Sequence, residues 1–301
     1  MTLAPELHTR RPRSAVLAYL SCVRYPEVLV LQGAPLLGVA FALPRSGAGQ
    51  IPSVAVFALA SLLLVAHVWT FNDWAGVTTD LNDPSRSGGV FSTKGVISLG
   101  LLLFSLGLLL ASLILFTLLS RRTLLLALAI AALGVLYSHP AVSAKGIPIV
   151  SSGPHLVGGV LHFLLGYSLF EAIDRRGVLI ALFFALTFTA GHLNQEVRDY
   201  EPDRRNGLRT NAVVFGKTRS FLASFVLFTL AYANLTLLAY GGVVPAPLGV
   251  LALVLYPVHL AWSVSALRAG LSFESVSRLQ NRYRLLYGLI GLCMITALLY
   301  R

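Results

Sequence analysis

The sequence predicts an all-α integral membrane protein, with nine transmembrane helices in a bundle around a central cavity that has a cytoplasmic mouth. Composition is the first observation behind this fold class: 56% of the 301 residues are hydrophobic and only 12% are charged, whereas soluble domains carry about 25% charged residues. The second observation is that the apolar residues form runs of roughly 17 to 25 residues, the length that crosses a bilayer as a helix. The third is that most acidic residues lie between these runs.

Nine apolar runs divide the chain, and the fourth is short with soft limits. A linker near residues 45–53, which contains Gly and Pro, separates the first two. Residues 1–13 are polar and basic, so we expect a disordered N-terminus, followed by one nine-helix domain over residues 14–301. The predicted spans cover about residues 26–44, 51–71, 95–117, 123–138, 153–170, 177–193, 219–240, 245–266 and 283–300.

The orientation in the membrane follows from the Lys and Arg residues, which concentrate in cytoplasmic loops. Nine crossings place the two termini on opposite sides. With the N-terminus in the cytoplasm, 17 of the 23 Lys and Arg residues are cytoplasmic, so we expect the N-terminus and the mouth to face the cytoplasm, in the cell (inner) membrane. The net charge of +11 then reflects contact with anionic membrane lipids rather than nucleic acid. The remaining six residues lie on the opposite side: Arg45, Arg121, Arg122, Arg175, Arg176 and Arg301.

Two stretches outside the apolar runs are expected to meet the membrane surface. Residues 14–25 are mildly amphipathic and should lie along the interface until Pro26 opens the first span. Arg24 is then expected at headgroup level as a lipid anchor. Residues 267–282 are expected to form a long basic loop, for which a lid over the mouth and a lipid-binding surface are both possible interpretations.

The second span ends in a polar stretch that carries Asn72, Asp73, Asp80 and Asp83. In a helix, residues seven or eight positions apart are separated by about two turns. Asn72 and Asp80, and likewise Asp73 and Asp80, can therefore line one wall.

The loop after the fourth span, residues 137–155, contains Lys145 as its only Lys or Arg, and Pro140 and Pro148 keep it irregular. A single lysine in a loop is ordinarily a solvated cation, but opposite acidic clusters and a metal it can bind a phosphate. No zinc site is expected here, because the histidine spacing does not resemble one; hydrogen-bonding or interfacial roles are favoured for His139, His155 and His162.

The third polar stretch, residues 194–216, places Glu196, Asp199 and Asp203 at spacings of three and four, which puts the three carboxylates on one face if the stretch is helical. A solvated loop, with these acids paired to neighbouring arginines, is the simpler interpretation. Against it, seven of the twelve acids fall in two loops on one membrane face: Asp73, Asp80, Asp83, Glu196, Asp199, Glu201 and Asp203. Clustered acids beside hydrocarbon need a cationic partner, and a divalent metal is the natural one.

Two acidic clusters at one face suit the binding of a diphosphate through Mg²⁺. Nearby Lys and Arg side chains would neutralise the charge that grows as a carbon–oxygen bond breaks. If the diphosphate leaves an allylic lipid, a carbocation remains, and an apolar bundle both accommodates the lipid tail and excludes water.

In these features the chain resembles the UbiA-type superfamily of intramembrane prenyltransferases, over about residues 20–300. Members have nine transmembrane helices and two aspartate-rich motifs on the cytoplasmic side. The stretch EVRDYEPDRRNGLRT resembles the second motif, DxxxD, at Asp199 and Asp203, with Glu196 where other members carry an acid, followed by a GxxT at Gly207 and Thr210. YSHPAVSAK is similar to the element YSxPPxRxK, which implies a diphosphate role for Lys145, although Ser143 replaces the usual arginine.

The first motif departs from the family pattern NDxxDxxxD, because the chain reads NDWAGVTTD. Asn72, Asp73 and Asp80 are retained, whereas Gly76 stands where the first acid of DxxxD belongs. One metal ligand is thereby lost, and Asp73 or Asp83 is the candidate to replace it.

A second departure follows directly, where RPxxxGxxS becomes VFSTKGVIS and Val90 and Phe91 replace the Arg-Pro pair. This change removes a phosphate-binding cation. Arg86 or Lys94 is the candidate to replace it.

The resemblance implies a Mg²⁺-dependent transfer of a prenyl group from a polyprenyl diphosphate donor to a lipophilic or aromatic acceptor that enters from the membrane lipids. UbiA-type terpene cyclisation, phosphoribosyl transfer to a polyprenyl phosphate, and a degenerate lipid-binding protein remain alternatives. The expected metal ligands are Asn72, Asp73, Asp80, Glu196, Asp199 and Asp203, of which Asp80, Asp199 and Asp203 are expected to be essential for catalysis. The expected diphosphate-binding cations are Lys145, Arg204, Arg86 and Lys94.

Overall fold

The computed structural model describes residues 15–44, 47–81, 87–142 and 144–299, which contain α-helices, short 3₁₀ turns and no strand. The predicted disordered segment 1–13, together with Asp83, Arg86 and Ser143, lies outside the described residues. The helices are α1 Ala15–Leu20, α2 Tyr25–Leu31, α3 Gly33–Ala42, α4 Ile51–Ala75, α5 Val77–Leu81, α6 Ser98–Thr117, α7 Arg121–Ser138, α8 Gly153–Tyr167, α9 Arg175–Arg198, α10 Tyr200–Arg205, α11 Asn211–Phe215, α12 Lys217–Tyr240, α13 Ala246–Arg268 and α14 Phe273–Leu299.

Eight helical segments in the described part of the chain are long and apolar enough to cross a membrane. They are Tyr25–Ala42, which joins α2 and α3, and the helices α4, α6, α7, α9, α12, α13 and α14. The predicted helical membrane fold is confirmed. The predicted fifth span, residues 153–170, corresponds to α8, whose 15 residues are too few for it to be counted among these eight, so the number nine is not confirmed.

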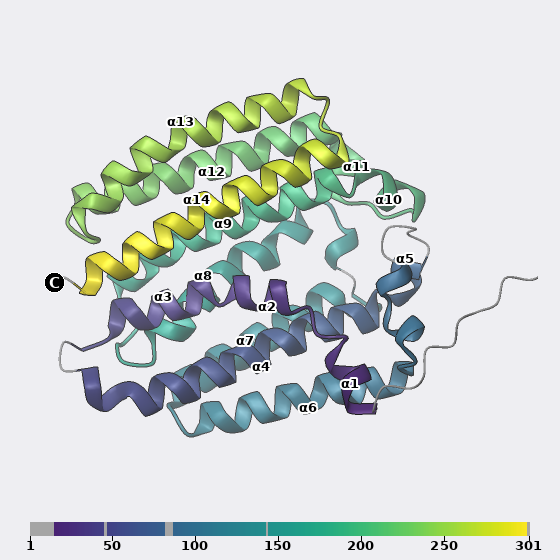
Figure 1. Ribbon diagram of the computed structural model, residues 1–301, viewed down its shortest axis with the longest axis horizontal. Coiled ribbons are helices and arrows are strands. Elements are labelled where there is room, and N and C mark those ends of the chain that lie inside the picture. The colour runs from purple at the N-terminus through teal and green to yellow at the C-terminus, as the bar shows by residue number, and fades with distance from the viewer. Residues whose placement is uncertain (1–14, 45–46, 82–86, 143, 300–301) are drawn as a thin grey trace, which may run out of the picture.

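The long helices run side by side along the long axis of the molecule, and the polar segments collect at one end (Figure 1). This end, which we call the motif end, carries α1, α5, α10 and α11. The turns between α3 and α4, α6 and α7, α8 and α9, and α12 and α13 lie at the opposite end, with the C-terminus. The two predicted acidic loops therefore lie at the same end of the bundle.

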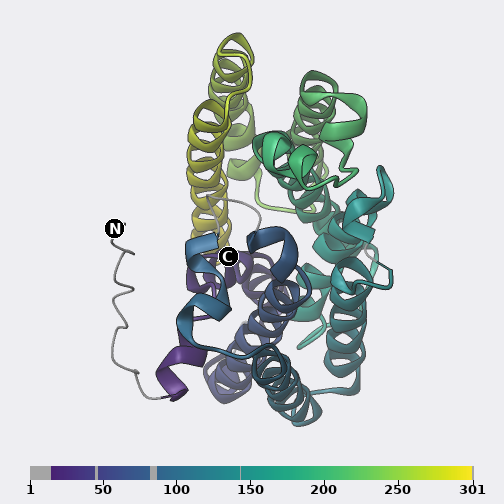
Figure 2. The ribbon, with the colours of Figure 1, turned by 90° about the vertical axis from the view of Figure 1, so that its right-hand side faces the viewer.

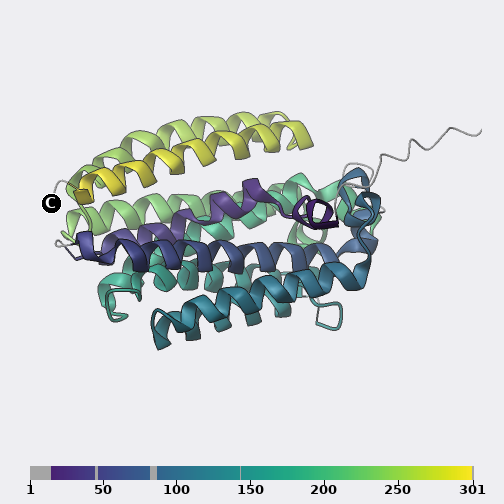
Figure 3. The same ribbon diagram turned by 60° about the horizontal axis from the view of Figure 1, so that its bottom comes forward.

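The early and late helices form two groups that α8 and α9 join. Seen onto the motif end, the purple and blue helices lie below and the green and yellow ones above, with the teal helices at one side (Figure 2). After rotation about the horizontal axis, the yellow-green helices α13 and α14 again lie apart from the blue helices α4 and α6 (Figure 3). Contacts of α8 with α3 and of α9 with α12 hold the two groups together.

Small residues allow the backbones of α3, α8 and α9 to approach closely. A Cβ atom on Gly166 would lie 1.8 Å from the carbonyl oxygen of Pro35, and one on Gly38 would lie 2.1 Å from that of Phe163. A Cβ atom on Gly159 would meet the backbone of Ala185 at 2.5 Å. Only glycine fits at these three positions.

Each acidic stretch falls where a long helix ends and a short one begins. Helix α4 ends at Ala75, Gly76 interrupts it, and α5 follows. Helix α9 ends at Arg198, Asp199 interrupts it, and α10 follows. The amides of Asp199 and Asp203 still donate to the carbonyl oxygens four residues earlier, so the helical hydrogen bonds continue through the interruption, and one shared face for Glu196, Asp199 and Asp203 stays a prediction.

The predicted basic loop at 267–282 is also corrected. Helix α14 begins at Phe273, ten residues before the predicted start of the last span, so only residues 269–272 separate it from α13. The polar first turns of α14 extend the helix beyond the apolar run, where Arg282 stacks 5.4 Å from the centroid of the Trp262 ring.

Candidate active site at the motif end

A cavity of about 340 Å³ at the motif end brings the two acidic stretches together. Asp73 and Asp80 line it from α4 and α5, and Arg198 lines it from the end of α9. We call it the polar cavity; its lining is Ser21, Cys22, Val23, Arg24, Asp73, Asp80, Gly89, Val90, Phe91, Lys94 and Arg198. Two carboxylates of the first acidic stretch thus share one space with cations from three parts of the chain, whereas Asp199 and Asp203 of the second stretch are not among its lining residues.

Arg24 belongs to this site, so its interpretation as a lipid anchor is wrong. Its Nε donates to Asp73 Oδ2 at 3.1 Å, its Nη2 donates to Oδ1 of the same carboxylate, and Nη2 lies 4.0 Å from Asp80 Oδ2. The guanidinium also stacks over Trp69, 5.3 Å from the ring centroid. The ion pair joins residues 49 positions apart, and no local pattern around Arg24 indicates its partner.

Lys94, a predicted diphosphate-binding cation, lines the polar cavity, and its Nζ donates to the backbone oxygen of Ser21 at 2.7 Å. The structure therefore places a cation of the first motif region beside its acids. The alternative candidates Asp83 and Arg86 lie outside the described residues.

Gly76, the departure from the family pattern, lies between Lys145 and Asp80. A Cβ atom at residue 76 would be 3.4 Å from Lys145 Nζ and 3.7 Å from Asp80 Oδ2. Both charged groups therefore approach the point at which a side chain would begin. Where the family pattern has an acidic side chain, this chain has only Gly76, and the Lys145 ammonium group lies next to the space left there.

The second acidic stretch is tied to the rest of the site by Arg198. Its Nε and Nη2 donate to the two oxygens of Asp199 at 2.7 and 2.8 Å, and its Nη1 donates to Gln280 Oε1 on α14 at 2.8 Å. Farther along, Asn206 Nδ2 donates to the backbone oxygen of Thr79 on α5 at 3.4 Å. The segment around α10 thus lies against α5. Within α10, Asp203 is partly buried, whereas Arg204 is exposed.

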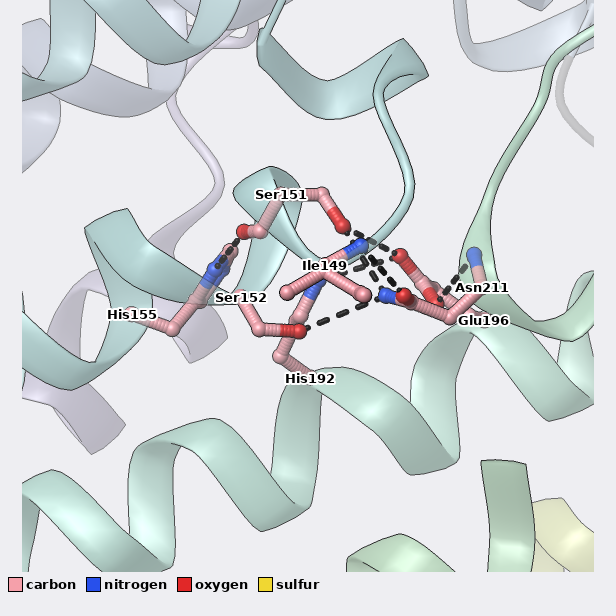
Figure 4. Close-up of polar contacts among 7 residues, drawn as sticks. All are labelled: Ile149, Ser151, Ser152, His155, His192, Glu196 and Asn211. Carbon is pink, nitrogen blue, oxygen red and sulfur yellow. Dashed lines mark hydrogen bonds and ion pairs between the residues drawn. The ribbon is translucent and has the colours of Figure 1, made fainter. Parts of the chain in front are cut away.

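Glu196 is held inside the protein (Figure 4). The Ser151 hydroxyl donates to its Oε1 at 3.1 Å, and the backbone N–H of Asn211 donates to its Oε2 at 3.0 Å. Its side chain is 5% exposed, and Glu196 is not among the described residues that line either cavity. This environment fits an anchor between α9, α11 and the loop before α8 better than the predicted metal ligand.

A larger cavity of about 740 Å³ extends among the helices. Asn72, Tyr137, His155, His192 and Gln195 line it where their helices reach the motif end, and leucine, phenylalanine and glycine residues make up much of the remaining lining. We call it the apolar cavity. Asn72 lines the apolar cavity and the next residue, Asp73, lines the polar cavity, so the last turn of α4 stands between the two.

The donor set fits Mg²⁺ bound together with a phosphate. Within the described ranges, no group of three or more His, Cys, Asp or Glu side chains could hold a metal ion. Mg²⁺ commonly uses one or two carboxylates, several waters and substrate phosphates rather than an all-protein cage. Asp80 supplies a carboxylate of that kind in the polar cavity, and the Asn72 amide belongs to the last turn of α4, at the wall of the apolar cavity.

The sequence model of the UbiA prenyltransferase family matches residues 34–275. The chain therefore belongs to this family, and it is a prenyltransferase embedded in the membrane through its apolar helices.

Particular relatives are consistent with that class. The chain is 28% identical over 272 residues to the lycopene elongase/hydratase of Haloarcula japonica, an alignment covering 82% of this chain and 88% of that protein. Its fold is similar to a structure of digeranylgeranylglyceryl phosphate synthase, with a TM-score of 0.73 and 17% identity over 95% of this chain and 99% of that one. It is also similar to a UbiA homologue from Archaeoglobus fulgidus bound to DMAPP and Mg²⁺, with a TM-score of 0.69 and 18% identity over 93% and 99% of the two chains.

Proposed function

We propose that this prenyltransferase moves a short prenyl group, in the presence of Mg²⁺, from an allylic diphosphate to the unsaturated end of an apolar acceptor. One observation carries the proposal: consecutive residues, Asn72 and Asp73, line the apolar and the polar cavity respectively. An amphiphile with a diphosphate head and a hydrocarbon tail fits such a pair of spaces, because each part meets groups of matching polarity.

The diphosphate is held in the polar cavity by cations from several elements. Arg24, Lys94 and Arg198 line that cavity, and Lys145 approaches Asp80 across Gly76. In the structure Arg24 pairs with Asp73 and Arg198 pairs with Asp199. A phosphate that enters the cavity offers each guanidinium group an equivalent bidentate partner. These cations stabilise the charge that develops on the leaving diphosphate.

Mg²⁺ would be held by Asp80 and Asn72 on one side and by Asp199 and Asp203 on the other. Bound there, the ion supplies Lewis-acid stabilisation of the diphosphate oxygens. We assign Glu196 to positioning instead, because Ser151 and Asn211 donate to its oxygens and it lines neither cavity. Asp73 and Asp199 are paired with Arg24 and Arg198, so either carboxylate would bind the ion only after the arriving phosphate takes over its guanidinium partner. The protein's own contribution is to orient the donor, exclude water from the reactive carbon and hold the acceptor beside it.

The apolar cavity favours a hydrocarbon acceptor. Arg284 is the single Lys, Arg, Asp or Glu side chain among the described residues that line it, so an acceptor with an anionic headgroup would meet few partners there. The similarity to a lycopene elongase/hydratase and to a homologue bound to DMAPP supports dimethylallyl diphosphate as donor and a polyene such as lycopene as acceptor. The Lys and Arg distribution supports a cytoplasmic motif end.

Purified protein in lipid vesicles, given dimethylallyl diphosphate, lycopene and Mg²⁺, tests the proposal. We expect diphosphate release and an elongated carotenoid, both abolished by a chelator and by Asp80→Asn. The proposal is contradicted if the donor is bound and consumed at the same rate without acceptor, or if no diphosphate is released. A cyclised hydrocarbon formed from geranylgeranyl diphosphate alone would instead support the terpene cyclase alternative.

A further inference from the structure

The apolar cavity contains a small set of groups that can accept a proton. No Asp or Glu is among the described residues that line it, and Arg284 remains protonated at any physiological pH. The imidazole side chains among its lining residues are His155, His162 and His192, and a neutral imidazole has a ring nitrogen whose lone pair can accept a proton. A prenyl transfer to an alkene carbon leaves a cation on the acceptor, and this cation becomes a stable alkene by losing a proton to a base. The inference below therefore rests on the proposed function.

Two of these histidines form a stacked pair at the motif end. The rings of His155 and His192 are 3.7 Å apart at their centroids and 9° from parallel. Tyr137 packs edge-on against both, at 5.0 Å from His155 and 6.2 Å from His192. The contacts come from α7, α8 and α9, so three helices fix the orientation of the His155 ring.

The tautomer of His155 follows from its hydrogen bond. Its Nδ1 lies 3.1 Å from the backbone oxygen of Ser151, and a carbonyl oxygen only accepts, so Nδ1 carries the hydrogen. Nε2 consequently carries the lone pair, and it makes no hydrogen bond to any described residue. His155 thus presents a fixed nitrogen with an available lone pair at a wall of the apolar cavity.

A buried anion lies behind the pair (Figure 4). His192 Nε2 is 3.1 Å from Glu196 Oε1, an ion-pair contact whose direction does not meet hydrogen-bond geometry. Both side chains are at most 5% exposed. His192 therefore stands between the His155 ring and the buried carboxylate, and its contact with Glu196 fixes the ring against which His155 stacks.

His155 is placed better than His162 for the reacting carbon. The two are seven residues apart on α8, or about 10 Å along the helix axis. His155 shares the motif end of the cavity with Asn72, next to the proposed diphosphate site, whereas His162 lies deeper, beside Phe188. The carbon that loses its proton is within a few bonds of the donor carbon, at the motif end.

We propose that His155 Nε2 takes the proton that the acceptor loses. The donor carbon–oxygen bond breaks, and its electron pair leaves with the diphosphate. The π electrons of the acceptor form the new carbon–carbon bond and leave a cation on the acceptor. The electron pair of an adjacent C–H bond then closes a new double bond, and the proton moves to His155, which later releases it to water at the motif end.

The His155→Gln variant, which keeps a polar side chain but removes the base, tests this role with dimethylallyl diphosphate and lycopene. We expect diphosphate release to continue in this variant. Formation of the elongated carotenoid that arises by loss of a proton should fall by about 100-fold, which is at the lower end of the range for removal of a general base. Hydrated or isomeric products should replace it. His139→Gln is the matched control, because His139 lines neither cavity and its Nδ1 only accepts from the backbone N–H of Ala141.

An unchanged product distribution in His155→Gln would overturn the proposal and point to the departing diphosphate as the base. A parallel loss of diphosphate release and product would also overturn it. Should His155→Gln not fold, His155→Ala supplemented with imidazole provides a second test: recovery of the proton-lost product supports the role, and no recovery in a folded variant contradicts it. Failure of the wild-type protein to release diphosphate would instead count against the proposed function.

Discussion

At position 76 the absence of a side chain determines which charged groups meet. Lys145 Nζ and Asp80 Oδ2 both lie within 4 Å of the point where a Cβ atom would stand. The sequence identified Gly76 as a departure and Lys145 as a phosphate ligand. It did not indicate that the two belong together, because residue 76 follows the end of α4 and residue 145 lies in the loop after α7, and the approach of these two segments depends on the packing of the bundle.

Restoring the acid with Gly76→Asp tests this arrangement. The new carboxylate would add a ligand beside Asp80, so we expect the Mg²⁺ concentration for half-maximal diphosphate release to fall by about tenfold, equivalent to about 1.4 kcal/mol. Titration of Mg²⁺ against activity measures the shift. Gly76→Asn has the same shape without the charge and should give a much smaller change; an equal shift in both variants would contradict the explanation.

Arg24 is the residue that sequence reasoning placed in the wrong environment. Its bidentate pair with Asp73 is long-range, whereas the interpretation as a lipid anchor came from the preceding amphipathic segment. Glu196 shows the same limit: its spacing to Asp199 predicts a metal ligand, but Ser151 and Asn211, which hold it, are distant in sequence.

We expect Arg24→Ala to weaken binding of geranyl S-thiolodiphosphate, an unreactive donor analogue, by about 10- to 100-fold. This is the range for losing charge-assisted hydrogen bonds worth about 1.5 to 3 kcal/mol. Isothermal calorimetry in detergent measures the affinity. Arg24→Lys keeps the positive charge but not the bidentate guanidinium, so its affinity for the analogue should lie between that of the wild type and that of Arg24→Ala. Wild-type affinity in Arg24→Ala would show that Arg24 does not bind the diphosphate.

At the scale of elements, hydrophobic runs predicted the long helices closely, since burial in hydrocarbon governs where they lie. The helix breaks were not predicted. Local backbone geometry at Gly76 and Asp199 ends α4 and α9. The first turns of α14, from Phe273, are polar, so a search for apolar runs does not detect them. These breaks matter because they direct α5 and α10 toward each other.

Helix packing through glycine gives a prediction at this scale. Gly166→Ala would place a Cβ atom 1.8 Å from the Pro35 carbonyl oxygen, so α3 and α8 must separate, at a cost of about 1–3 kcal/mol or more. Thermal unfolding in detergent should show a clearly lower Tm. Gly107→Ala on α6 meets nothing within 4 Å and should leave Tm unchanged or slightly raised. Similar Tm values for the two variants would contradict this account of the packing.

At the scale of the whole molecule, the sequence predicted that both acidic loops face one side, and the structure places them at one end (Figure 1). The separation of the site into a polar and an apolar cavity could not be predicted from the sequence. It depends on which faces of nearly uniform apolar helices turn inward, and such helices have no periodicity that reveals this.

Orientation in the membrane is tested by cysteine labelling. Arg204, at the motif end, and Leu118, at the opposite end, are both exposed. We expect Leu118→Cys to react with an impermeant maleimide in intact cells, and Arg204→Cys to react only after the membrane is opened, because Lys and Arg concentrate at the motif end and such an excess favours the cytoplasmic side. The parent protein, with Cys22 and Cys293, gives the background. The reverse labelling pattern would place the mouth on the outer side.

A structure of the protein in lipid with geranyl S-thiolodiphosphate and Mg²⁺ tests the central claim most directly. The account predicts the diphosphate among Arg24, Lys94 and Arg198, with the hydrocarbon chain passing Asn72 into the apolar cavity. Density for the diphosphate at the opposite end of the bundle, or for the chain outside the apolar cavity, would contradict it.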